Sequence, residues 1–274
     1  MFYRRRGLTH VVSPLLLATA FIALFASACD QGDAHWRSSS NLPDFASFQD
    51  VKEKKLAFFN FLRPIVDAEN ERVRSQQKRM IDIRNRLDLG KVISDKDQTW
   101  LMQLAEEYNL DTASLDEEQL WKLLKRRVDT VPFRLALAQA ANESSWGTSR
   151  FAREGLNLFG QWCFTPGCGM VPSKREEGKS HEVAKYKSVN ESVAAYIRSI
   201  NRVHMYTPLR MLRRDIRKRG GRPTAIELAQ ELSGYSERGE EYVKEIQEMI
   251  RINYTLMSGE APSAQYETSK STNR

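Results

Sequence analysis

The sequence contains few of the residues from which metal centres and cysteine-rich scaffolds are built. Its 274 residues include three cysteines and four histidines, and the histidines are scattered without the spacing of metal ligands. Cys163 and Cys168 form one C-x4-C pair with no second pair and no histidine nearby, so we expect no metal and no cofactor. With 9 Pro, 14 Gly and no internal repeat, the composition is that of an ordinary globular protein.

A long apolar run occurs at the N-terminus. Residues 1–28 begin with three arginines at positions 4–6, continue with VVSPLLLATAFIALFASA and contain no acid, which is the form of a secretory signal peptide. The run is also about as long as a thin membrane span, so an uncleaved anchor stays an alternative. The segment FASAC places small residues directly before Cys29 and resembles a bacterial lipoprotein processing site. We expect cleavage after residue 28 and lipidation of Cys29, with a plain signal peptide as the other alternative.

The net charge expected after signal-peptide cleavage argues against a nucleic-acid partner. Loss of residues 1–28 removes three arginines and lowers the formal net charge from +7 to +4. We interpret the dense basic stretch LRMLRRDIRKRGGR (209–222) as a solvated helix face or a contact for an anionic envelope polymer. Asp30, directly after Cys29, resembles the inner-membrane retention signal of enteric lipoproteins. The expected location is the periplasmic side of a bacterial membrane, lipid-anchored, with the inner membrane favoured.

The remaining cysteines lie in the segment CFTPGC. A Thr-Pro-Gly turn between Cys163 and Cys168 brings the ends of this short loop together. An exported protein meets oxidising conditions, so we predict a disulfide between them.

Helical patterns dominate the rest of the chain. Residues 29–43 are polar and turn-rich, as expected of a tether, and residues 44–129 form an amphipathic helical region in which Pro64 predicts a kink or break. The segment HEVAKYKSV (181–189) alternates enough to predict a strand in a small β-lobe, and residues 257–274 are predicted to be a disordered tail.

A helix that begins near Pro132 has almost no polar face and ends at Glu143. Burial and the negative end of the helix dipole both raise the pKa of a carboxyl group placed there. An acid still protonated near neutral pH can protonate the leaving oxygen of a glycosidic bond. Trp146, Phe159 and Trp162 would supply an apolar wall and flat surfaces for sugar rings. The competing interpretation is a helix-end Glu paired with an arginine such as Arg150 or Arg153.

The stretch LAQAANESSWGTSRFAREGLNLFGQW (137–162) resembles the signature of bacterial glucosaminidase-type peptidoglycan hydrolases, most closely their Bax-type branch. That family carries its catalytic glutamate in A-Q-A-x-x-E-S-x-W-G, followed by N-L-F-G, and the matching residues are Gln139, Glu143, Ser144, Trp146, Gly147 and 157–160. The stretch GYSERGEEYVKEIQEMI resembles its C-terminal motif through Tyr235 and Tyr242. Here the two tyrosines are seven apart, one more than usual, and Gly239 stands where a proline is common.

The resemblance implies an α+β, mainly α fold of lysozyme-like type. A catalytic domain over 130–256 would contain a central catalytic helix and a small β-lobe, preceded by a helical arm. It also implies that Glu143 and Tyr235 are catalytic. The substrate-binding residues it implies are Ser144, Trp146, Asn157, Phe159, Trp162 and Tyr242.

A second catalytic carboxylate would come from the β-lobe. Glu176, Glu177 and Glu182 are available there, and we take Glu177 and Glu182 as the candidates. Assistance by the N-acetyl group of the substrate would remove the need for any of them.

The function implied is an envelope-anchored endo-β-N-acetylglucosaminidase that cleaves peptidoglycan glycan strands with Glu143 as general acid. Two alternatives stay open. A lytic transglycosylase needs only one acid, and a non-catalytic peptidoglycan-binding scaffold lipoprotein would use the N-terminal helices to dock a protein partner.

Overall fold

The computed structural model describes residues 41–173, 175, 178 and 180–259. The predicted signal peptide, Cys29, Asp30 and Glu177 therefore lie outside the described residues. Among the residues that are described, no helix combines the length and apolar composition needed to cross a membrane.

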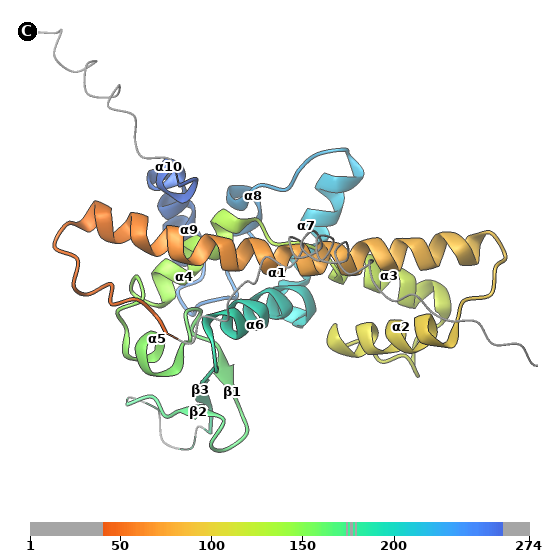
Figure 1. The fold of residues 1–274 in the computed structure, drawn as a ribbon, viewed down its shortest axis with the longest axis horizontal. Coiled ribbons are helices and arrows are strands. Elements are labelled where there is room, and N and C mark those ends of the chain that lie inside the picture. Colours follow the sequence, from red (N-terminus) through yellow and green to blue (C-terminus); the bar gives the residue numbers. More distant parts are fainter. Residues whose placement is uncertain (1–40, 174, 176–177, 179, 260–274) are drawn as a thin grey trace, which may run out of the picture. The chain divides into compact units, whose positions relative to one another are not determined.

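The first helix, α1 (Val51–Asp88), continues through Pro64 (Figure 1). Of the predicted kink or break, the break is therefore wrong. The carboxylate of Asp50 caps the N-terminus of α1 by accepting a hydrogen bond from the backbone N–H of Glu53 at 2.8 Å. Buried side chains on both sides of the proline, Leu62 and Val66 among them, hold the helix against the rest of the protein. This packing outweighs the backbone hydrogen bond that a proline removes from a helix interior.

Short helices and three short strands follow α1. The helices are α2 (Asp95–Glu107), α3 (Glu117–Arg127), α4 (Phe133–Glu143), α5 (Arg150–Gly155), α6 (Val189–Arg202), η1 (His204–Tyr206), α7 (Thr207–Lys218), α8 (Ala225–Ala229), α9 (Glu240–Ile252) and α10 (Tyr254–Met257). The strands are β1 (Trp162–Cys163), β2 (Gly169–Met170) and β3 (Glu182–Ala184). This composition confirms the predicted α+β, mainly α class.

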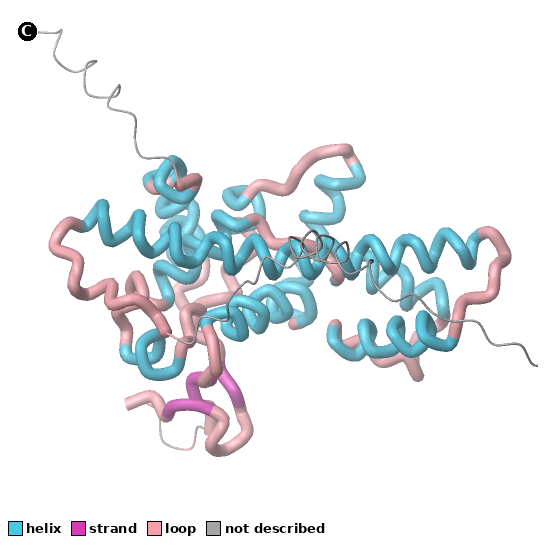
Figure 2. The backbone as a smooth tube through the Cα atoms, in the orientation of Figure 1, coloured by secondary structure: helices cyan, strands magenta, loops and turns pink. Residues whose placement is uncertain are grey.

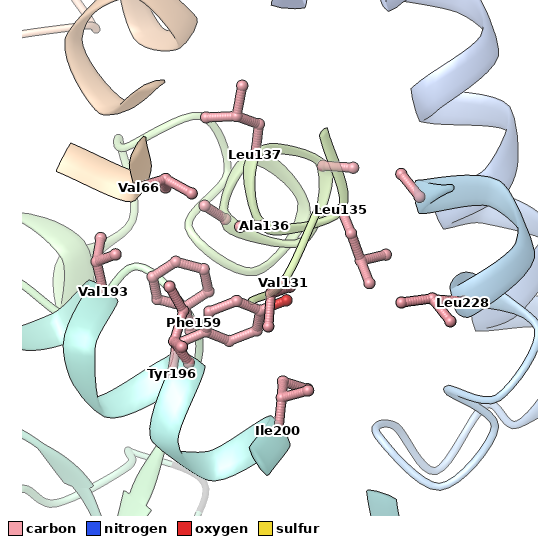
Figure 3. Packing of buried hydrophobic residues seen from close by; sticks show 14 of the residues in the cluster. Val66, Val131, Leu135, Ala136, Leu137, Phe159, Val193, Tyr196, Ile200 and Leu228 are labelled. Carbon is pink, nitrogen blue, oxygen red and sulfur yellow. The ribbon is translucent and has the colours of Figure 1, made fainter. Parts of the chain in front are cut away.

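Helix α4 lies at the centre of the hydrophobic core. Every residue from 135 to 141 is buried, which agrees with the nearly continuous apolar sequence of this helix. Helices α1, α8, α9 and α10 contact it, and α6 packs on α1 beside it. Figure 3 shows Val66, Val193, Tyr196 and Leu228 from three of these helices around the α4 side chains. The end of α4 is therefore held from several sides.

The strands form one antiparallel sheet in the order β1-β3-β2 (Figure 2, magenta). Val183 of β3 pairs with Trp162 on one side and Met170 on the other. Gly169 is required at its position because a Cβ there would lie 2.1 Å from the carbonyl oxygen of Val183. A disulfide joins Cys163 to Cys168 and closes the loop between β1 and β2.

The region preceding α4 shares its hydrophobic core. Phe58, Phe59 and Leu62 of α1 belong to the same buried cluster as Leu135 of α4. At the other end of the chain, Met257 is fully buried, and Arg63 and Arg134 both donate hydrogen bonds to Ser258. Residues 257–259 are therefore part of the folded body, and the rest of the predicted tail lies outside the described residues.

The basic stretch 209–222 is only partly a solvated face. Arg210 and Arg213 are each 1% exposed, and both donate hydrogen bonds to backbone carbonyls in the interior. The predicted solvated face holds for residues 217–222, which are exposed, and not for Arg210 and Arg213, which α7 turns toward the core as hydrogen-bond donors.

Candidate active site

Glu143 is the last residue of α4, and its side chain is half-buried. Burial raises the pKa of its carboxyl group, and the negative charge of Glu245 adds to this. Hydrogen bonds with Tyr242 and Asn142, together with the positive charge of Arg238, act in the opposite direction. The net pKa lies above the ordinary value of 4.5. Glu143 is thus placed to keep a proton to higher pH than a solvated glutamate.

A chain of hydrogen bonds leads from Glu143 into the core. The hydroxyl of Tyr242 interacts with the Glu143 carboxylate and accepts a 3.0 Å hydrogen bond from Nε2 of Gln139. The Oε1 atom of Gln139 accepts a 2.7 Å hydrogen bond from the hydroxyl of Tyr196. Since Gln139 and Tyr196 are fully buried, this arrangement fixes the Tyr242 hydroxyl with its proton directed away from Gln139. Tyr242 therefore contacts the Glu143 carboxyl group from the core side. It is 1% exposed, which is too deeply buried to contact a substrate.

The turn after α4 depends on Ser144. Its hydroxyl donates to the carbonyl of Ala140 and accepts a 2.8 Å hydrogen bond from the backbone N–H of Gly147. Ser144 is fully buried, so the prediction that it binds substrate gives way to a role in ending the helix. The backbone then passes through positive φ at Ser145 (51°), Trp146 (61°) and Gly147 (78°). Such a sharp reversal carries the chain away from the helix axis directly after Glu143.

Trp146 packs on α1 instead of lining the site beside Glu143. Its ring meets Phe58 and Phe59 edge-on, with centroid distances of 5.7 Å and 5.3 Å. The amine of Lys55 lies 5.1 Å from the ring centroid. The prediction of a sugar-binding wall is therefore corrected for this residue: it fastens the turn after Glu143 to the N-terminal helix.

The segment 157–160 returns the chain to Glu143. Asn157 holds it in place, because its side-chain amide donates to the carbonyls of Gln161 and Ala184 at 2.9 Å each. Its Oδ1 atom accepts from the backbone N–H groups of Phe159 and Gln161. Gly160 has φ +63°, and a Cβ at this position would lie 3.1 Å from Oε2 of Glu143. The backbone at Gly160 therefore borders the carboxylate directly.

Asn157 and Phe159 are 1% exposed, so neither contacts a ligand through its side chain as predicted. The Phe159 ring stacks on Tyr196 with centroids 4.1 Å apart (Figure 3). Both buried side chains instead fix the conformation of the segment 157–160, which lies against Glu143.

Tyr235 joins this segment to the C-terminal helices. Its hydroxyl donates a 2.8 Å hydrogen bond to the carbonyl of Phe159, and its ring stacks on Tyr242 with centroids 5.4 Å apart. The negative charge of Glu143 contributes to raising the pKa of Tyr235, although burial is the larger cause. The structure thus brings Tyr235, Tyr242 and the 157–160 segment together around Glu143.

The β-lobe presents an exposed aromatic surface. Trp162 is 55% exposed and stacks on His181 with centroids 4.1 Å apart. Among the predicted aromatic contacts it alone offers a largely open ring face, within the described part of the chain. It remains the candidate for stacking against a sugar.

The carboxylate of Glu182 is hydrogen-bonded to the loop of the β-lobe. Its two carboxylate oxygens accept hydrogen bonds from the backbone N–H groups of Gly167 (3.0 Å) and Gly169 (2.8 Å), which lower its pKa. These bonds give Glu182 a structural function, and its assignment as the second catalytic carboxylate stays a prediction. It also lies near Cys163 and Cys168, but the disulfide removes both sulfur atoms as metal ligands.

Charged neighbours of Glu143 were missed at the sequence level. Arg238 and Glu245 form an ion pair, and both act on the pKa of Glu143. Arg150, proposed as a partner for Glu143, instead lies 4.0 Å from Glu154 and donates to the carbonyl of Val171. No spacing rule would have found Arg238, because it reaches Glu143 only through the folding of the segment that precedes α9.

Comparisons with known proteins bear on this site. The family model described as Glucosaminidase, mannosyl-glycoprotein endo-beta-N-acetylglucosaminidase, matches residues 118–255, which is half of the chain. The chain belongs to the glucosaminidase family. It is also 29% identical over 220 residues to protein bax of Escherichia coli strain K12, an alignment that covers 80% of this chain and 77% of that protein. No solved structure matches the chain.

Membership of the glucosaminidase family makes the protein a glycoside hydrolase, and the predicted lysozyme-like architecture is consistent with it. The glucosaminidase match begins at residue 118, before the start predicted at residue 130. Similarity to protein bax spans more of the chain than the glucosaminidase match, in keeping with a core shared between α1 and α4.

In a glucosaminidase, a half-buried glutamate with a raised pKa is suited to protonate a glycosidic oxygen. Tyr242 and Gln139 fix the orientation of the carboxyl group, and the backbone at Gly160 limits the space beside it. The sequence identified Glu143 through its helix end, but it did not identify Tyr196 or the connection through Gln139. Only burial of those polar side chains in the same core reveals the network.

Proposed function

We propose that this glucosaminidase cleaves the glycan strands of peptidoglycan as an endo-β-N-acetylglucosaminidase, with Glu143 as general acid. The observation that carries the proposal is the raised pKa of Glu143 at the end of a buried helix, within a family of glycan-cleaving enzymes. Burial raises the pKa of the carboxyl group, which favours its protonated form, and the hydroxyl of Tyr242 is hydrogen-bonded to it. Trp162, exposed on the β-lobe, provides a platform on which a sugar ring would stack.

The hydrogen bonds of Glu182 support a mechanism in which, among the carboxyl groups that the structure describes, Glu143 acts without a second one; Glu177 lies outside the described residues. A two-carboxylate glycosidase needs its second group roughly 5–9 Å from the first and free to receive charge or activate water. Glu182 already accepts two backbone hydrogen bonds, and Glu245 is paired with Arg238. Assistance by the N-acetyl group of the substrate fits this arrangement, as does lytic transglycosylation, which is the second candidate reaction.

The location proposed for this reaction is the periplasmic side of a bacterial membrane. The support comes from residues 1–30: an apolar run behind three arginines, small residues before Cys29, and Asp30. Lipidation of Cys29 would hold the enzyme beside its polymeric substrate. Metabolic labelling with a fatty acid, compared between wild type and Cys29→Ser, tests the anchor.

The decisive experiment is digestion of purified sacculi with wild type and Glu143→Gln, followed by mass spectrometry of the released fragments. New reducing N-acetylglucosamine ends that depend on Glu143 support the proposed hydrolysis. Ends with 1,6-anhydro rings identify the transglycosylase reaction instead. If sacculi bind the protein but wild type releases no fragment, the protein acts as a scaffold and the proposal fails.

A further inference from the structure

A positively charged hollow of about 320 Å³ lies between α3 and α7, apart from the site around Glu143. This volume is at the lower end of the range for small-molecule sites, about 300 to 1,000 Å³. Its lining consists of six cations and one acid: Lys122, Lys125, Arg126, Arg214, Arg217, Lys218 and Asp129. Helix α4 separates it from Glu143: Asp129 precedes the first turn of this 11-residue helix and Glu143 ends the last. The helix alone is roughly 16 Å long.

The two walls of the hollow carry the same charge pattern. Lys122, Lys125 and Arg126 on α3 are spaced i, i+3, i+4, and so are Arg214, Arg217 and Lys218 on α7. Residues at this spacing project from one side of a helix. Because α3 and α7 pack against each other, the cationic side chains of both helices border the same space, and their carbon stems form most of its surface.

The acid in the lining does not neutralise these cations. Oδ2 of Asp129 lies 3.2 Å from Nε of Arg213, which is buried behind the hollow, and 2.8 Å from Nε of Arg217. Arg217 also donates from Nη2 to Oδ1 at 2.9 Å, so Asp129 balances the charge of this one lining arginine. The other five cations of the lining are left, and Arg213 behind the hollow adds a further positive charge. The carboxylate also accepts hydrogen bonds from Gln77 and from the backbone N–H of Thr130.

Most of the other cations have no acidic partner among the described residues. Lys122, Lys125 and Lys218 form no ion pair there, and Arg126 contacts the sulfur of Met211, while its buried Nε has no acceptor. Arg214 pairs with Asp215, its neighbour in sequence. Like charges gathered on two facing helices repel one another unless a counter-ion lies between them.

Together with burial, the concentration of positive charge around the hollow lowers the pKa of two neighbouring arginines, Arg210 and Arg127. Burial and then the charges of Arg127, Arg213 and Arg126 lower the pKa of Arg210 to about 10. Burial together with Arg126 also lowers the pKa of Arg127. The region thus carries more positive charge than its own acids balance.

We propose that the hollow between α3 and α7 binds a phosphate-bearing anion. A phosphate group directs oxygens toward several sides, so it can accept hydrogen bonds from lysines and arginines on both walls at once. A single carboxylate has two oxygens in one plane and cannot meet both walls equally. The same chemistry is present in soluble phosphates and in the headgroups of anionic phospholipids. The site does not depend on the reaction proposed for Glu143.

The test is isothermal titration of the full chain at low ionic strength, where charge interactions are least screened. The probes are inorganic pyrophosphate, dihexanoylphosphatidylglycerol below its micelle concentration, and dihexanoylphosphatidylcholine as a neutral lipid. The variant Lys125→Ala/Lys218→Ala removes one exposed, unpaired lysine from each wall. The control Lys52→Ala/Lys96→Ala removes the same charge from exposed positions outside the hollow.

We expect wild type to bind pyrophosphate and the wall variant to bind it roughly tenfold or more weakly, whereas the control stays within about twofold. The variant Lys125→Arg/Lys218→Arg should retain binding, because it keeps both charges. Binding of the phosphatidylglycerol probe as well identifies a lipid headgroup as a source, and binding of pyrophosphate alone identifies a soluble phosphate. The proposal is overturned if neither anionic probe binds, or if the control loses as much affinity as the wall variant.

Discussion

Gly160 lies against the carboxylate of Glu143, although 17 positions separate the two residues in sequence. A Cβ at Gly160 would be 3.1 Å from Oε2 of Glu143, and the backbone there has φ +63°. Contact and conformation both favour glycine at this position. The relationship explains why the Asn-Leu-Phe-Gly segment accompanies the glutamate: it brings a backbone without a side chain to the place where the carboxyl group needs room.

The variant Gly160→Ala should therefore lower activity by displacing Glu143. The contact requires Glu143 to move by a few tenths of an ångström, whereas a shift of about 1 Å in a catalytic group costs on the order of a hundredfold in rate. We expect kcat/KM for fragment release from sacculi to fall about 3- to 10-fold, with a loss of about 1 kcal/mol in the free energy of unfolding from the positive φ. Gly90→Ala is the matched control, because its φ is +70° and nothing lies within 4 Å of its Cβ. Equal losses of activity in the two variants would contradict the displacement.

Tyr242→Phe should change the pH dependence of catalysis. The hydrogen bond from Tyr242 lowers the pKa of Glu143, so its removal raises that pKa further. A general acid is active while protonated, and the alkaline limb of kcat/KM reports its pKa in the free enzyme. The limb is therefore expected to move to higher pH in Tyr242→Phe. The control Tyr108→Phe removes a buried hydroxyl that donates to Gln76, and it should leave the limb in place. An unchanged limb in both variants would show that Tyr242 does not act on Glu143.

Glu182→Gln should weaken the β-lobe without abolishing the reaction. Backbone N–H groups of Gly167 and Gly169 depress the pKa of Glu182, so the stabilisation it gives is present above the unfolded value, near 4.5, and is lost as pH falls through the folded pKa. We expect faster proteolysis in the 163–182 loop of the variant at neutral pH, and a loss of activity of a few fold. Wild type should approach the proteolysis rate of the variant as the pH falls through the lowered pKa of Glu182.

Glu177→Gln is the companion measurement, since Glu177 stays a predicted catalytic residue outside the described part of the chain. A loss of activity as large as that of Glu143→Gln would identify it as the second carboxylate. A near-complete loss in Glu182→Gln with an unchanged rate of proteolysis would instead restore Glu182 as the catalytic group.

Substitution of Trp146 should lower the stability of the protein, whereas substitution of Trp162 should weaken substrate binding. Trp146 packs on Phe58 and Phe59, so Trp146→Ala is expected to cost about 3 kcal/mol in the free energy of unfolding. Trp162 is 55% exposed, so Trp162→Ala should change that free energy by less than about 1 kcal/mol and instead raise KM for glycan fragments. Denaturant unfolding and steady-state kinetics on both variants provide the comparison. A raised KM in Trp146→Ala with unchanged stability would return it to the sugar-binding surface.

Local sequence predicted several features of the fold well. The apolar run from Phe133 to Ala141 predicted a buried helix, because a helix without a polar face has to be covered on all sides. The prediction of a helix break at Pro64 failed, because the packing of α1 outweighs the local tendency of proline to end a helix. Local sequence did not indicate that Ser144 is fully buried or that Trp146 packs on Phe59 of α1.

The sequence by itself determined that a glutamate ends a buried helix and is followed by a sharp turn, since both depend on residues that are neighbours in the chain. The tertiary structure decided what surrounds that glutamate. Tyr242, Arg238 and Gly160 come from segments distant in sequence, and their effect on the Glu143 carboxyl depends on distances and burial that only packing sets. The same holds for the hollow between α3 and α7. Each helix shows its charges in the sequence, but only the packing of the two helices gathers them around one space.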